Sequence, residues 1–165
     1  MIIDGFNLII TVEAALSGGP LFVGVDDCIR DLSSVHGSYR SVEETERAIS
    51  MIGETLQRFD PSSVLWLLDR PVSNSGRLAA KIADFATRND CPWEVQVLFN
   101  PDAAIVQSPA IAITSDSVVL DRVQVWADLK SYLIAREVPD AWMIDLRTCG
   151  HSGWLVDGKN PNPLA

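Results

Sequence analysis

Short uninterrupted apolar runs recur along the chain, and an aspartate follows each of them closely. The pairs of run and acid are 1–3 with Asp4, 64–68 with Asp69, and 110–114 with Asp116. Short apolar runs bounded by polar residues are typical of strands that are buried on both faces, as in the parallel sheets of α/β proteins. We therefore predict three central strands, each with an acid at or just beyond its carboxyl end.

Segments with other periodicities separate these runs. Residues 41–59 place apolar side chains at intervals of seven, three, four and three, which predicts a helix with one apolar face, and Ser41 with Glu44 forms a capping-box pair at its start. Residues 75–89 predict a second amphipathic helix. Residues 93–99 alternate apolar and polar side chains, which predicts a half-exposed strand at the edge of the sheet.

Weaker patterns predict the remaining elements. Short helices are expected at 11–16, 103–106 and 117–122, a longer helix at 127–137, and strands at 123–126 and 141–146. Residues 17–40 form a long connection without a clear element, and such connections are often lids or binding segments. The last residues, 148–165, are rich in Gly, Asn and Pro and predict coil.

Strands that alternate with helices predict an α/β fold with right-handed crossovers. We expect a single three-layer domain at 1–147, followed by a C-terminal tail at 148–165. The central sheet should be mostly parallel. Because 93–99 belongs at an edge and the apolar runs belong at the centre, the expected strand order is 3-2-1-4-5.

The composition fits one folded domain in a reducing compartment. The chain has 165 residues, of which 47% are hydrophobic, enough for one sizeable core. No apolar run approaches the ~20 residues of a membrane span, and charged or turn residues interrupt the N-terminus too early for a signal peptide. The three cysteines are far apart, which argues against a disulfide framework. We expect a cytoplasmic protein without membrane contact and, because the chain opens on a central strand, an N-terminal domain that this chain lacks.

The net charge argues against tight non-specific binding to nucleic acid. It is −9, from 22 acidic and 13 basic residues, whereas such binding depends on neutralising phosphates with basic side chains. Four acids held by a divalent metal would improve the balance, but the chain would remain acidic. Any contact with nucleic acid must therefore come from a local basic rim.

The acids that follow the predicted strands should meet in one crevice. Ligands bind beyond the carboxyl ends of the strands in open parallel sheets, where we expect Asp4, Asp69 and Asp116, joined by Asp102 after the edge strand. Ionised carboxylates a few Å apart repel by about 4 kcal/mol per pair at an effective dielectric constant of about 20, so such a cluster needs a cation or shared protons. A structural alternative stays open, because Asp-Gly at Asp4 is a common turn pair and Asp102 also fits a helix cap.

Four segments carry a resemblance to a known family. They are Ile3-Asp4-Gly5-Phe6-Asn7, Leu68-Asp69-Arg70, Pro101-Asp102-Ala103-Ala104-Ile105-Val106 and Thr114-Ser115-Asp116. In this order, over residues 1 to about 126, the set resembles the PIN-like nuclease superfamily, in particular the branch that includes NYN domains. It is most similar to an uncharacterised prokaryotic branch of PIN-like proteins, for which the resemblance supplies no substrate.

The resemblance implies a metal-dependent endoribonuclease that hydrolyses RNA to 5′-phosphate and 3′-hydroxyl ends. The catalytic and metal-binding residues would be Asp4, Asp69, Asp102 and Asp116, with Asp4 and Asp116 as inner ligands. Mg²⁺ or Mn²⁺ suits such a set, because these ions take oxygen ligands and activate water for in-line attack on a phosphodiester. Asn7 and Ser115 would orient ligands or contact the scissile phosphate.

Other interpretations stay open beside this one. Arg70 is either a phosphate clamp or a counter-ion of Asp69, and the chain is either an enzyme or an inactive PIN-like module that binds RNA or a protein partner. A phosphohydrolase of the haloacid-dehalogenase type also has an Asp after its first strand, but it would need a second Asp where this chain has Phe6. A dinucleotide-binding domain is disfavoured because no Gly-x-Gly-x-x-Gly follows the first strand. The RNA target, the number of metal ions and a homodimer are left open.

Overall fold

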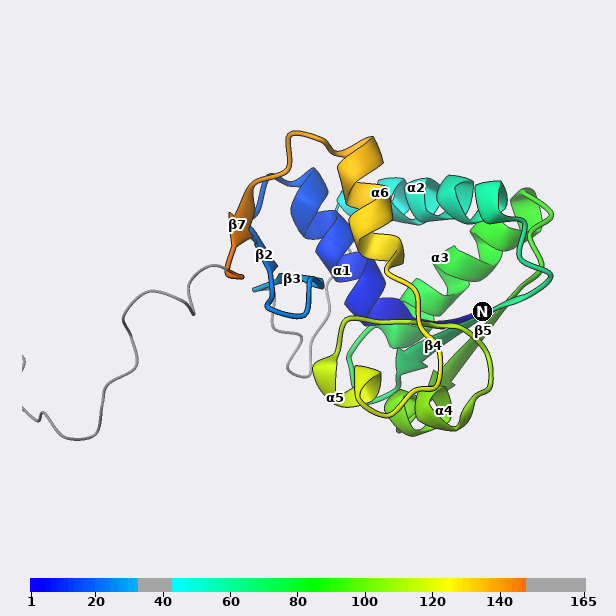
Figure 1. Cartoon of the computed structure of the whole chain (residues 1–165). Coiled ribbons are helices and arrows are strands. Elements are labelled where there is room, and N and C mark those ends of the chain that lie inside the picture. Colours follow the sequence, from blue (N-terminus) through cyan, green and yellow to red (C-terminus); the bar gives the residue numbers. More distant parts are fainter. Residues whose placement is uncertain (33–42, 148–165) are drawn as a thin grey trace, which may run out of the picture.

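The computed structural model of the protein describes residues 1–32 and 43–147 (Figure 1). The predicted capping residue Ser41 and the predicted tail at 148–165 lie outside the described residues. No helix in the described part of the chain is both long enough and apolar enough to cross a membrane.

A parallel sheet occupies the centre of the fold, with its strands in the order β5-β4-β1-β6. The strands are β1 (Ile2–Asp4), β4 (Val64–Asp69), β5 (Trp93–Leu98) and β6 (Ala112–Ile113). Ile2 of β1 stands opposite Leu65 of β4 on one side and Ala112 of β6 on the other. The prediction of an α/β fold with a mostly parallel central sheet and 93–99 at its edge is confirmed.

Helices cover both faces of this sheet. Successive residues of its strands face opposite sides, and because most of these residues are apolar, each face needs a covering layer. The helices are α1 (Gly5–Leu16), α2 (Glu44–Phe59), α3 (Ser75–Arg88), α4 (Pro101–Gln107), α5 (Ser117–Leu120) and α6 (Leu129–Glu137). Ile3, Trp66 and Leu68 belong to the larger core, under α1, α2, α3 and α6. Ile2 and Leu67 belong to a smaller core with α4 and α5. In Figure 1, α2 and α6 lie above the sheet and α4 and α5 lie below it.

The predicted fifth strand of the order 3-2-1-4-5 is absent from the central sheet as the structure describes it. Residues 123–126, one candidate, contribute a single bridge, between Trp126 and Ala112. The other candidate, at 141–146, forms β7 (Met143–Asp145), which lies in a different sheet.

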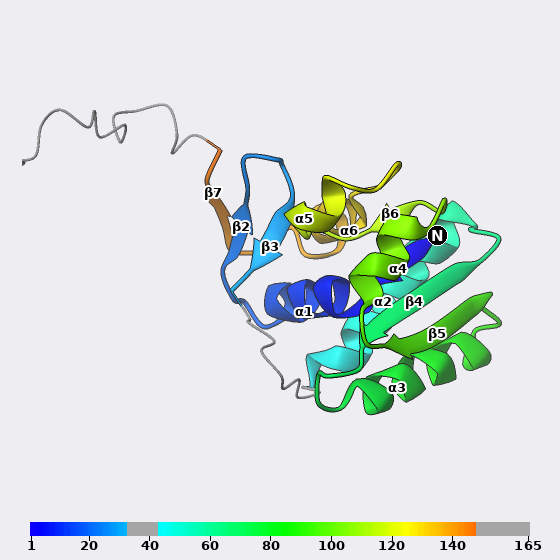
Figure 2. The same cartoon turned by 90° about the horizontal axis from the view of Figure 1, so that it is seen from below.

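The second sheet shows that the prediction of a long connection without a clear element at 17–40 is wrong for residues 21–31. Residues 21–31 form a hairpin rather than an open connection, with β2 (Leu21–Val23) antiparallel to β3 (Ile29–Asp31). β7 pairs with β2 in parallel, which gives the order β3-β2-β7. Figure 2 shows this small sheet beside α1, apart from the central sheet. Strands of three residues are too short to show a period, so the sequence pattern did not reveal them.

Most predicted helices occur where expected, with one clear exception. α3 and α6 match the helices predicted at 75–89 and 127–137, and α2 covers the described part of the helix predicted at 41–59. α1 begins at Gly5, six residues before the predicted start at residue 11. The reason is that Asp4, the last residue of β1, itself caps the helix.

Candidate functional site

Asp4 stands where β1 ends and α1 begins. Its Oδ1 accepts a hydrogen bond from the backbone N–H of Asn7, with a distance of 3.3 Å, and so caps the helix. The junction is tight, because a Cβ on Gly5 would lie 2.6 Å from Cδ2 of Leu68 and 3.0 Å from the backbone oxygen of Leu67. The Asp4-Gly5 pair therefore makes the strand-to-helix turn and also fixes the Asp4 carboxylate at the edge of the sheet.

Thr114 joins Asp4 to Asp116. Its hydroxyl donates to Oδ2 of Asp4 at 3.0 Å, and its Oγ1 accepts from the backbone N–H of Asp116 at 3.1 Å. Asp116 caps α5 in turn, since its Oδ1 accepts from the backbone N–H groups of Val118 and Val119 at 2.8 and 3.3 Å. Among the described residues, none donates a hydrogen bond to Oδ2 of Asp116.

Asp69 and Asp102 lie at the same carboxyl edge of the sheet, at or after the ends of its neighbouring strands β4 and β5. Asp69 is the last residue of β4, and Asp102 lies in the first turn of α4, which follows β5. The cap of α4 is Asn100, whose side-chain oxygen accepts from the backbone N–H of Ala103 at 3.1 Å, so the capping role considered for Asp102 belongs to Asn100. Neither carboxylate accepts a hydrogen bond from the part of the chain that the structure describes.

Electrostatic interactions link the four carboxylates. Burial raises the pKa of Asp4 to about 6, against the lowering effects of its hydrogen bonds and of Lys130, and the charge of Asp102 raises it further. Burial and then the charge of Asp102 raise the pKa of Asp69, while burial and then the charge of Asp116 raise that of Asp102. Asp102 thus acts on both Asp4 and Asp69, and Asp116 acts on Asp102, as expected for carboxylates at one edge of a sheet.

The donor set suits a hard divalent cation in its chemistry. All four groups supply carboxylate oxygens, the kind of ligand that Mg²⁺ and Mn²⁺ take. Burial is the main cause of the raised pKa values of Asp4, Asp69 and Asp102, and a bound cation would stabilise the ionised form of each carboxyl group. Within residues 1–32 and 43–147, no three His, Cys, Asp or Glu side chains form a ready-made cluster for a metal ion.

Arg70 does not pair with Asp69. Its side chain is exposed, and the guanidinium carbon lies 4.8 Å from the centroid of the Phe99 ring, a cation–π contact. No described carboxylate forms an ion pair with it. The counter-ion role considered for Arg70 is therefore not found, and the role of phosphate clamp stays a prediction.

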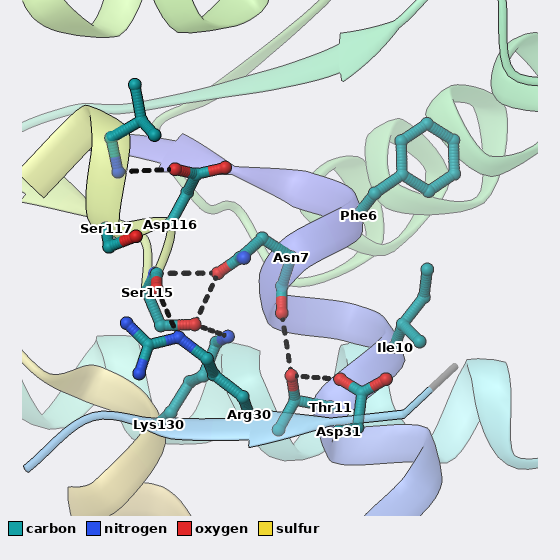
Figure 3. Close-up of a pocket in the computed structure, with 11 residues that line it drawn as sticks. Phe6, Asn7, Ile10, Thr11, Arg30, Asp31, Ser115, Asp116, Ser117 and Lys130 are labelled. Atoms are coloured by element: carbon teal, nitrogen blue, oxygen red, sulfur yellow. Dashed lines mark hydrogen bonds between the residues drawn. The ribbon is translucent and has the colours of Figure 1, made fainter. Parts of the chain in front are cut away.

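Asn7 and Ser115 meet near Asp116, as Figure 3 shows. The backbone N–H and the hydroxyl of Ser115 both donate to Oδ1 of Asn7, at 2.8 and 3.2 Å. Lys130 of α6 extends the group, since its Nζ donates to Oγ of Ser115 at 2.6 Å. The two polar residues predicted to contact a phosphate thus lie together with a cation.

Lys130 is a residue that the sequence analysis did not single out. It is only 2% exposed, and burial lowers its pKa to about 8 even though Asp4 and two other acids raise it. The available signal was its spacing: Lys130 precedes the apolar residues Leu133 and Ile134 by three and four positions, which places it on the buried face of the helix.

A pocket of about 530 Å³ opens beside this group. Arg30 of β3 forms part of its wall, because its Nε donates to the backbone oxygen of Ser115 at 2.9 Å. The same guanidinium donates to both carboxylate oxygens of Asp26, at 2.8 and 2.6 Å, and is held in place by them. The hairpin that the sequence pattern did not reveal thus supplies one side of the pocket.

The structure is that of an α/β protein with four aspartates at or after the carboxyl ends of its parallel strands. The chain belongs to the family described as Domain of unknown function (DUF5616), which matches residues 1–132. It is 36% identical over 118 residues to the Uncharacterized protein MJ0935 of Methanocaldococcus jannaschii, and the match covers 72% of this chain and 56% of that protein. The chain thus spans little more than half the length of this relative. No solved structure matches the chain.

Proposed function

We propose that the protein is a PIN-like, metal-dependent ribonuclease that hydrolyses RNA phosphodiesters to 5′-phosphate and 3′-hydroxyl ends. The observation that carries the proposal is the position of Asp4, Asp69, Asp102 and Asp116 at or after the carboxyl ends of the four parallel strands, where burial raises the pKa values of Asp4, Asp69 and Asp102. The strand order β5-β4-β1-β6, with its acids at one edge, is compatible with the PIN-like fold.

Each aspartate has a role that follows from its surroundings. Asp4 and Asp116, held by helix caps and by Thr114, would be the fixed ligands of Mg²⁺ or Mn²⁺. Asp69 and Asp102, which accept no hydrogen bonds from the described residues, would complete the site as adjustable ligands, directly or through water. The bound cation would supply positive charge that lowers the pKa of a water molecule and stabilises the departing oxygen.

Hydrolysis of the RNA phosphodiester needs no reactant other than water. The oxygen of a water molecule forms a bond to phosphorus, and the bond between phosphorus and O3′ breaks. The electron pair stays on O3′, which takes up a proton, while the attacking water loses one to solvent. The products are a 5′-phosphate and a 3′-hydroxyl, and the task of the protein residues is to hold the phosphate in line with the water.

Cleavage of labelled RNA tests the proposal. A mixture of single-stranded and structured RNA is incubated with the wild type in Mn²⁺ or in EDTA, and with Asp116→Asn in Mn²⁺. Asn retains the side-chain oxygen that caps α5 but removes the charge, so we expect a loss of at least about 100-fold. Asp121→Asn is the matched control, because Asp121 is exposed at the end of the same helix. This variant should cleave RNA like the wild type.

The outcomes separate the enzyme from its main alternative. Cleavage that requires Mn²⁺ and Asp116 supports the ribonuclease, and cleavage that survives both EDTA and Asp116→Asn excludes this site. The net charge of −9 favours the alternative, a catalytically inactive module that binds RNA or a protein partner. If calorimetry detects no Mn²⁺ binding to the wild type and no RNA is cleaved, this alternative replaces the enzyme.

A further inference from the structure

The pocket beside Asp116 contains a buried cation that lacks an ion-pair partner among the described residues. The Lys130 ammonium group is 2% exposed, carries three N–H donors, and has its hydrogen bond with the neutral hydroxyl of Ser115. Asp4, Asp31 and Asp128 act on it through space, yet burial still lowers its pKa. Because burial of an ionised group is unfavourable unless an opposite charge contacts it, an anionic group in hydrogen-bond contact with Nζ would stabilise the Lys130 ammonium group.

Asn7 adds donors of fixed direction to the same place. A backbone N–H can only donate, so the Asn7 atom that faces the backbone N–H of Ser115 must be its oxygen. The NH₂ group of Asn7 is consequently turned away from Ser115, and none of the described residues accepts a hydrogen bond from it. Figure 3 shows Asn7, Ser115 and Lys130 grouped between the carboxylates of Asp116 and Asp31.

The rest of the pocket suits a body that is partly apolar. Phe6, Ile10 and Val118 line it together with the polar group, and its volume of about 530 Å³ is in the range of small-molecule sites. Asp116 belongs both to this pocket and to the acidic edge. A chain with a phosphate at the edge therefore has its neighbouring nucleotide within reach of the pocket.

We propose that this pocket binds one phosphorylated nucleotide of the RNA chain, with its phosphate on Nζ of Lys130 and the side-chain NH₂ of Asn7, and with its base against Phe6 and Ile10. The proposal rests on the proposed function for the identity of the ligand as RNA. Lys130 would be a residue that binds the substrate and not a metal ligand. In the competing interpretation, Lys130 is only a structural counter-ion of Asp4.

Calorimetry in EDTA with uridine 5′-monophosphate and with uridine tests the pocket without metal or cleavage. We expect the wild type to bind the monophosphate at least tenfold more tightly than uridine. Lys130→Met should weaken binding of the monophosphate at least tenfold, and it should fold, because Met replaces the buried stem without a charge. Asn7→Asp keeps the oxygen that faces Ser115 but replaces the donor by an anion, so it should also weaken binding at least tenfold.

The control is Lys81→Met, which removes a surface lysine paired with Glu46 at 2.6 Å and should leave both affinities unchanged. The proposal is overturned if the wild type does not bind the monophosphate, if it binds uridine equally well, or if Lys130→Met and Asn7→Asp retain the wild-type affinity. Binding that depends on Lys130 in a protein that cleaves no RNA would support the pocket and reject the hydrolytic function. Metal-dependent cleavage without binding of the monophosphate would do the opposite.

Discussion

Replacement of Asp4 by Asn tests how unfavourable the negative charge at the acidic edge is. Asn retains the size of the side chain and the oxygen that accepts from the backbone N–H of Asn7, but it carries no charge. Burial raises the pKa of Asp4 from 3.8 to about 6. Since one pKa unit corresponds to about 1.4 kcal/mol, ionisation of Asp4 destabilises the folded state by about 3 kcal/mol at pH values well above 6.

The pH dependence follows from the sign of this shift. A carboxyl group with a higher pKa in the folded state favours folding fully below its unfolded pKa of 3.8, and this contribution is lost as the pH rises through about 6. In EDTA, Asp4→Asn should therefore be more stable than the wild type by up to about 3 kcal/mol at pH 7.5, and by roughly half of that at pH 5. The value is an upper limit, because in the variant Lys130 loses a favourable interaction with Asp4, and the Thr114 hydroxyl loses the carboxylate oxygen to which it donates.

Urea denaturation of both proteins at the two pH values measures the effect. Asp26→Asn is a control of opposite sign, because hydrogen bonds from Arg30 lower the pKa of Asp26 to about 2, and its stabilising contribution is present above pH 3.8 and lost as the pH falls through about 2. Asp26 is exposed, so its replacement should cost less than about 1 kcal/mol at pH 7.5. The reasoning is refuted if Asp4→Asn is no more stable than the wild type at pH 7.5, or if its advantage does not shrink at pH 5.

Gly5→Ala and Asp102→Asn test the geometry of the edge, with Gly76→Ala as a control for the first. Gly5→Ala should lower the free energy of unfolding by about 1–3 kcal/mol, because the new Cβ would lie 2.6 Å from Cδ2 of Leu68, whereas Gly76→Ala, with open space around it, should raise that energy by about 0.5–1 kcal/mol. Urea denaturation measures both, and equal effects would contradict the close contact at Gly5. Asp102→Asn should lower the pKa of Asp69, because a neighbouring negative charge is removed. Carbon-13 NMR titration of the carboxyl groups measures this pKa, and an unchanged value would show that the two side chains lie far apart.

The central sheet was predictable because its strands are buried on both faces. That environment demands continuous apolar runs, such as the one over 64–68, and the run is visible without any knowledge of its partners. β2 and β7 have no such long apolar run. Each has three residues, and they stabilise each other although they lie near opposite ends of the described chain. A pairing of this kind depends on the completed fold, so local pattern does not reveal it.

In the candidate site, too, some residues are revealed by a local sequence pattern and others only by the completed fold. The aspartates could be found because each follows a strand signal, and parallel strands deliver their carboxyl ends to one edge. The start of α1 was missed because Asp4 was interpreted only as the end of a strand, although its side chain also caps the helix. Lys130 was missed because a single lysine in a helix is most often solvated, and its burial depends on β3, α1 and the loop after β6 all meeting at the same pocket.

The proposed hydrolysis requires that the four aspartates form one site for a divalent cation. Titration of the isotope-labelled protein with Mn²⁺, followed by paramagnetic broadening of amide resonances, measures this directly. We predict that substoichiometric Mn²⁺ first broadens the amides around Asp4, Asp69, Asp102 and Asp116 together, and that Asp116→Asn greatly reduces the broadening. Broadening that is spread over the acidic surface, or that persists unchanged in Asp116→Asn, would contradict the account.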